Sequence, residues 1–108
     1  MNQIKNIDAK TLHQWLEDGE AIVIDVRETE EFQSGHIKNA VHIPLALIKY
    51  EDISLAEYAG KKIVMQCRSG VRSILAGQKV SENQQKLQLY NLEGGILAWQ
   101  EAGFFIQK

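Results

Sequence analysis

The chain has 108 residues, a formal net charge of −2 at pH 7, and 44% hydrophobic against 24% charged residues. This composition is that of a soluble globular protein, and the length suffices to bury one core without disulfides or a structural metal. The balanced charge excludes a typical nucleic-acid-binding surface. No apolar run has the length of a signal peptide or a membrane span, so we expect a cytoplasmic protein that binds neither nucleic acid nor membrane.

Strand-like and helical segments alternate along the chain. Asp8 is a typical N-cap and predicts a helix that ends at Asp18-Gly19. The other predicted elements are strands over 21–26, 40–43, 62–66 and 87–92, a short helix over 28–33, weak helices over 45–50 and 53–58, and helices over 72–81 and 96–101. This order indicates an α/β fold with a mainly parallel sheet. We expect a single domain over residues 1–108, and a monomer.

The only cysteine, Cys67, directly follows the strand predicted over 62–66 and begins the segment Cys67-Arg68-Ser69-Gly70-Val71-Arg72-Ser73. In open parallel sheets, ligands bind outside the carboxyl ends of the strands. Gly70 can adopt a positive φ, so the N–H groups of this turn can converge on one point, and the helix that follows adds partial positive charge there. We therefore predict that Cys67 is a nucleophile in an anion-binding loop. The helix after the loop is expected to bury Ile74, Leu75 and Val80.

Activation of the thiol contributes less than binding of charge. Lowering a thiol pKa from about 8.5 to about 6.5 raises the thiolate fraction at pH 7 roughly 25-fold, but the accompanying loss of nucleophilicity leaves a net gain of about threefold. The segment 61–81 contains five basic residues and no acidic one, whereas 17–31 contains seven acidic residues and one basic residue. Arg68 and Arg72 are thus candidates to hold an anionic substrate, or alternatively to pair with the acidic segment, while Ser69 and Ser73 are candidates to hydrogen-bond to sulfur.

Three motifs in order resemble the rhodanese-like family. The first comprises Asp25-Val26-Arg27-Glu28, Glu31-Phe32, Gly35-His36-Ile37, Ala40 and Ile43-Pro44; the second is the Cys67 to Ser73 loop; the third is Glu93-Gly94-Gly95 with Ala98-Trp99 and Gly103. The resemblance implies a three-layer sandwich with a mainly parallel five-stranded sheet and helices on both faces. It also implies transfer of sulfane sulfur from thiosulfate or a similar anionic donor to cyanide, a thiol or a protein acceptor, through a Cys67 persulfide and with ping-pong kinetics.

The remaining candidates have structural explanations. Asp25, Arg27, Glu28 and His36 are candidates for supporting the active site from behind, although the motif that contains them is expected to be mainly structural. The three histidines lack further cysteines nearby, so no metal site is expected. Gly94-Gly95 lacks the other features of a dinucleotide fingerprint, so no cofactor is expected.

Two other functions compete with sulfur transfer. Cys67 and Arg72 resemble the cysteine-to-arginine loop of phosphatases and arsenate reductases, but only four residues separate them, whereas the phosphatase signature has five. A carrier or sensor of persulfide, or an interaction module with slow turnover, would share every residue of the loop. The sequence favours the enzyme and leaves the carrier as an alternative.

Overall fold

The computed structural model describes residues 4–81 and 88–108. The elements in chain order are β1 (Lys5–Ile7), α1 (Ala9–Glu17), β2 (Ala21–Asp25), α2 (Thr29–Gln33), β3 (Val41–His42), α3 (Tyr50–Ile53), the 3-10 helix η1 (Ala56–Tyr58), β4 (Lys62–Gln66), α4 (Val71–Ser81), β5 (Leu89–Leu92) and α5 (Gly95–Glu101). The strands form one sheet in the order β1-β5-β4-β2-β3, and all neighbouring pairs are parallel. The predicted five-stranded α/β fold is confirmed.

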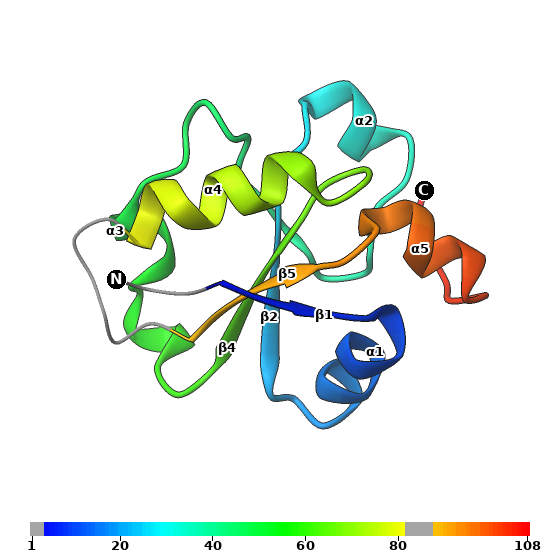
Figure 1. Ribbon diagram of the computed structural model, residues 1–108, viewed down its shortest axis with the longest axis horizontal. Helices are drawn as coiled ribbons and strands as arrows, with labels where there is room; N and C mark the ends of the chain where they lie inside the picture. Colours follow the sequence, from blue (N-terminus) through cyan, green and yellow to red (C-terminus); the bar gives the residue numbers. More distant parts are fainter. Residues whose placement is uncertain (1–3, 82–87) are drawn as a thin grey trace.

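Helices cover both faces of this sheet (Figure 1). On one face, α3 and α4 pack on a cluster that includes Ile24, Ile63, Met65 and Cys67. On the other face, α1 and α5 pack on a second cluster built around Val23, Val64, Leu92 and Trp99. The strands β2 and β4 contribute to both clusters, which explains why their sequences are nearly continuous apolar runs rather than alternating ones. The predicted three-layer sandwich is therefore observed.

The strand order places β4 at the centre of the sheet, between β5 and β2. Cys67 follows the last residue of β4, and the motif around Asp25 lies at the end of the neighbouring β2. Because the strands are parallel, their carboxyl ends meet at one edge of the sheet, which is where ligands bind in such folds. No helix within residues 4–81 and 88–108 has the length and apolar character needed to cross a lipid bilayer.

Three local predictions are wrong. Residues 45–50 do not form a helix, because the N–H of Leu45 donates to the carbonyl of Val26 and the chain then turns, so that α3 begins only at Tyr50. On α4, Leu75 is 49% exposed, and Ser73 with Ala76 occupies the buried face instead. Ile74 is only half-buried, while Val80 is buried as predicted.

The edge strand β1 was not predicted. It has three residues, two of them polar and exposed, and is defined only by its pairing with β5 about 85 residues later. The prediction of the last strand began at Leu87, which lies outside the described residues, and the rest of that strand is confirmed as β5.

Candidate active site

The sulfur of Cys67 lies at the base of the predicted loop and faces its backbone. Cys67 is only 1% exposed. Its Sγ accepts a hydrogen bond from the N–H of Gly70 at 3.1 Å, and the hydroxyl oxygen of Ser73 lies 3.4 Å away. Gly70 has a φ of 104°, which turns its N–H back toward the sulfur and is a conformation that favours glycine. The loop therefore surrounds Cys67 in the way that its sequence predicts.

The loop is held from behind by the first turn of α5. The N–H of Ile96 donates to the carbonyl of Cys67 at 2.9 Å, and the N–H of Leu97 donates to the carbonyl of Arg68 at 3.2 Å. Gly95 makes this approach possible, since a Cβ at that position would lie only 2.4 Å from the carbonyl oxygen of Arg68 and 2.5 Å from that of Cys67. The third sequence motif thus supports the second through backbone contacts.

The carbonyls of Cys67 and Arg68 point toward α5, and several N–H groups of the loop face away from that helix. Within the described parts of the chain, the N–H groups of Arg68, Val71 and Arg72 have no hydrogen-bond acceptor. Two of them belong to the first turn of α4, whose N-terminus carries partial positive charge. The site can therefore bind an anion through backbone groups, without a metal.

The surroundings of Cys67 act on its ionisation in opposite directions. Burial raises the pKa of the thiol, because it disfavours the charged form. Hydrogen bonds that the charged sulfur can accept from the hydroxyl and backbone of Ser73 and from the backbone of Gly70 and Ser69 lower it, and they outweigh burial. The pKa of Cys67 therefore lies below its ordinary value, as expected for a nucleophilic cysteine.

The structure places the two arginines of the loop in different environments. Arg72 makes a bidentate ion pair with Glu31 of α2, with N–O distances of 2.7 and 2.9 Å. This pairing with the acidic segment is the alternative that the sequence left open for Arg72. Arg68 is exposed, and its guanidinium has no hydrogen-bond or ion-pair partner in the portion of the chain that is described. Arg68 is thus free to meet an anionic ligand, whereas Arg72 already has a carboxylate.

Asp25 and Arg27 form a buried pair at the end of β2. The carboxylate of Asp25 is fully buried and accepts from Nε and Nη2 of Arg27, the latter at 2.8 Å. A second bond from Nη2 reaches the carbonyl of Gly35 at 2.8 Å, and His42 bonds to the carbonyl of Arg27. These bonds connect the end of β2 both to Gly35, which follows α2, and to His42 of β3. They support a structural role for the first motif.

Glu28 and His36 belong to the same structural unit. The N–H of Glu28 donates to the carboxylate of Glu31 at 2.9 Å, so Glu28 is the N-cap residue of α2. His36 and His42 stack on Phe32, with ring centroids 3.9 and 4.5 Å from it. Nδ1 of His36 also bonds to the carbonyl of Phe32. Neither Glu28 nor His36 is hydrogen-bonded to Cys67 or its loop within the described residues.

One polar residue at the site was missed by the sequence analysis. Asn91 of β5 is buried, and its Oδ1 accepts a hydrogen bond from the hydroxyl of Ser73. Its Nδ2 donates to Oδ1 of Asn6 on β1 at 2.9 Å. The available signal was an asparagine inside the apolar run Leu89-Tyr90-Asn91-Leu92, since a buried amide requires partners.

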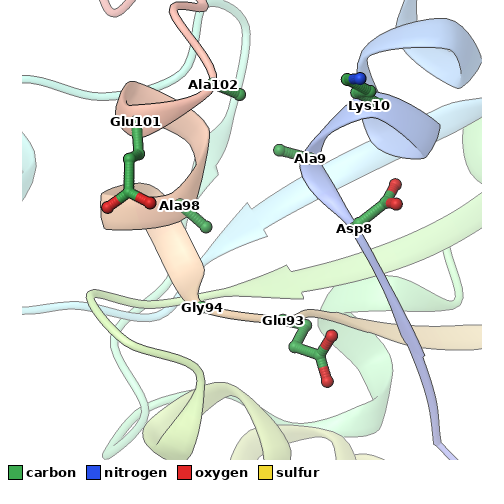
Figure 2. A pocket seen from close by; sticks show the side chains of 8 residues that line it. All are labelled: Asp8, Ala9, Lys10, Glu93, Gly94, Ala98, Glu101 and Ala102. Carbon is green, nitrogen blue, oxygen red and sulfur yellow. The ribbon is translucent and has the colours of Figure 1, made fainter.

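A surface hollow of about 540 Å³ lies elsewhere, between α1 and α5 (Figure 2). It is lined by the acidic residues Asp8, Glu93 and Glu101 and, among the described residues, by one basic residue, Lys10. Cys67 does not line it. Since this hollow is acidic, it would repel an anionic substrate, and we assign the candidate active site to the cysteine loop.

A buried cysteine whose sulfur faces the amides of a loop, at the carboxyl edge of a parallel sheet, is the arrangement expected of α/β domains that act on anionic or sulfur-containing groups. Within this class, the chain belongs to the rhodanese-like domain family, whose sequence profile matches residues 8–102. The resemblance inferred from the three motifs is thereby confirmed.

Three relatives illustrate the range of this family. A Bacillus subtilis protein provisionally named sulfurtransferase YtwF is 38% identical over 99 residues, which are 91% of this chain and 92% of YtwF. A tRNA uridine(34) hydroxylase of Salmonella newport is 32% identical over 97 residues, which are 86% of this chain and 27% of the hydroxylase. The crystal structure of a rhodanese-related protein from Thermoplasma volcanium is 30% identical with a TM-score of 0.74, covering 95% of this chain and 97% of that protein. The family match and the similarity to YtwF support a sulfurtransferase-type enzyme.

Proposed function

We propose that the domain transfers sulfane sulfur from thiosulfate, or a donor of similar charge, to a thiophilic acceptor such as cyanide or a thiol. The observation that carries this proposal is the position of the Cys67 sulfur, which faces the N–H of Gly70 at 3.1 Å inside a loop where the amides of Arg68, Val71 and Arg72 lack acceptors among the described residues. A loop of this kind stabilises negative charge on a sulfur atom bound to the cysteine.

The reaction is balanced without an external oxidant. In the first half-reaction, the thiolate of Cys67 attacks the outer sulfur of thiosulfate, the sulfur–sulfur bond of the donor breaks, and its electron pair leaves with sulfite. Cys67 then carries a persulfide, whose terminal sulfur is negatively charged. In the second half-reaction, the acceptor attacks that terminal sulfur, and the thiolate of Cys67 leaves.

The residues of the loop have different roles in the proposed reaction. The free amides of Arg68, Val71 and Arg72 would hold the terminal sulfur of the persulfide, since their N–H groups have no other acceptor within the described residues. The exposed guanidinium of Arg68 would bind the sulfonate end of the donor. Arg72 would mainly order the loop, because Glu31 occupies both of its terminal nitrogens.

The direct test is the intact mass of the protein before and after incubation with thiosulfate, followed by thiocyanate formation with cyanide. We expect the wild type to gain one sulfur atom and to form thiocyanate, and Cys67→Ser to do neither. If no sulfane donor adds sulfur to the wild type, the proposed function is wrong. If sulfur is added but turnover is negligible with every small acceptor, the domain is a persulfide carrier.

Arg68→Ala separates donor binding from chemistry. We expect the KM for thiosulfate to rise about tenfold with a smaller change in kcat, since one charge-assisted contact to the donor is lost. The matched control is Lys38→Ala, which removes an exposed cation outside the loop. An equal effect of both substitutions would show that Arg68 acts only through the net charge of the domain.

A further inference from the structure

A chain of three hydrogen bonds links the thiol to the edge of the sheet. The Sγ of Cys67 lies 3.4 Å from the hydroxyl of Ser73, that hydroxyl donates to Oδ1 of Asn91, and Nδ2 of Asn91 donates to Oδ1 of Asn6. Ser73 and Asn91 are buried, whereas Asn6 is exposed on β1. This series of hydrogen bonds therefore connects the sulfur of Cys67 to Asn6, a surface residue that does not contact the sulfur directly.

The direction of each bond follows from the one before it. Oδ1 of Asn6 accepts from Nδ2 of Asn91, so the amide of Asn91 must turn its oxygen toward Ser73. A hydroxyl has only one proton, and that of Ser73 is given to this oxygen. Ser73 consequently presents a lone pair to the sulfur of Cys67, an arrangement that suits a thiol S–H donor.

We propose that Asn91, oriented by Asn6, is a positioning residue that competes for the proton of the Ser73 hydroxyl and thereby limits the support that this hydroxyl gives to the Cys67 thiolate. When the thiol loses its proton, the sulfur becomes an acceptor. The proton of Ser73 can then turn to the sulfur only by leaving Oδ1 of Asn91, which would remain buried without a donor. Formation of the thiolate is coupled in this way to the orientation of a buried amide.

This inference builds on the proposed role of Cys67 as the nucleophile, but it concerns ionisation and not sulfur transfer. Among the described residues, Arg72 of α4 interacts electrostatically with Cys67 and is itself influenced by Glu31 and Glu28, and the Asp25–Arg27 pair lies at the end of the neighbouring strand β2. The exposed guanidinium of Arg68 lies in the loop itself. The substitutions proposed below leave all of these charges in place.

The test is the pH dependence of Cys67 alkylation by iodoacetamide, which reports the thiol pKa directly. Asn6→Ala removes the acceptor that orients Asn91, so the amide can rotate and donate Nδ2 to Ser73, whose proton then points to the sulfur. We expect the midpoint to fall by about half a unit to one unit, with about three to ten times more thiolate on the low-pH side of the midpoint. Asn91→Asp provides only acceptors and adds a negative charge, so its midpoint is expected to rise.

Two controls test whether the effect of Asn6 on the thiol passes through Asn91 and Ser73. Gln100→Ala removes an exposed amide on α5 and is expected to leave the midpoint unchanged. In a Ser73→Ala background, Asn6→Ala is expected to have no further effect, because the residue that transmits the change is absent. A midpoint that does not fall in Asn6→Ala, or that falls equally with and without Ser73, would overturn the inference. Because alkylation needs no sulfur donor, failure of sulfur transfer would refute the proposed function and not this inference.

Discussion

The ion pair between Glu31 and Arg72 joins α2 to the first turn of α4, in the loop that begins with Cys67. The hydrogen bond from Arg72 lowers the pKa of Glu31 from an ordinary 4.5 to about 2, although burial acts in the opposite direction. In a fully shielded pair, a shift of this size would correspond to about 3 kcal/mol. The two side chains are 32% and 30% exposed, so screening by water reduces the expected contribution to about 1–2 kcal/mol.

Glu31→Gln is the substitution that tests this value, because the amide keeps an oxygen for the N–H of Glu28 but loses the charge. We expect the free energy of unfolding in urea at pH 7 to fall by about 1–2 kcal/mol. The pKa of Glu31 is lower in the folded state than in the unfolded state. The stabilisation is therefore fully present above about pH 5 and is lost as the pH falls through about 2.

The pH dependence of this stability difference separates the loss of the ion pair from a change in side-chain packing. The difference between wild type and Glu31→Gln is expected to shrink to about half near pH 3. The matched control is Glu30→Gln, an exposed carboxylate on the same helix, which is expected to change stability by less than about 0.5 kcal/mol. If the two substitutions cost the same, or if the cost of Glu31→Gln is constant between pH 7 and pH 3, the reasoning fails.

Three further predictions concern the backbone, the buried pair and the thiol. Gly95→Ala is expected to lower the free energy of unfolding by about 2–4 kcal/mol, because its Cβ would lie 2.4 Å from a backbone oxygen. The control is Gly103→Ala, which is also at positive φ but in open space and should cost about 1 kcal/mol. Equal costs in urea unfolding would contradict the contact between Gly95 and the loop. Arg27→Met is expected to cost about 3–5 kcal/mol by leaving the carboxylate of Asp25 buried and unpaired, and a loss below 1 kcal/mol in the same assay would contradict a structural role. Alkylation of Cys67 is expected to have its midpoint below the value of about 8.5 for a free cysteine, and a higher midpoint would show that burial dominates.

The sequence predicted the central strands and the cysteine loop because these features depend on local patterns. The apolar runs of β2 and β4 are buried on both faces, and Gly70 adopts the positive φ that the loop motif requires. The pairing of Arg72 remained open, since its partner lies 41 residues earlier in the chain. Only the tertiary structure brings Glu31 of α2 to Arg72 of α4 and leaves Arg68 without an ion-pair partner among the described residues.

The parts that could not be predicted depend on distant contacts. The strand β1 has no sequence pattern of its own and exists through its register with β5. Leu75 fits an apolar face of α4, yet that face turns toward solvent because Ser73 must reach Asn91 on the other side. The role of Asn91 could not be inferred from a single asparagine, since it requires three elements to be brought together.

The support that α5 gives to the cysteine loop has a consequence for the order of synthesis. Cys67 leaves the ribosome well before Ile96 and Leu97, whose N–H groups hold the carbonyls of the loop. A nascent chain that has not yet reached Gly95 therefore has the thiol but lacks the contacts that turn the loop amides toward it. The thiol and its anion-binding site thus come together only when the C-terminal part of the domain has been made and folded.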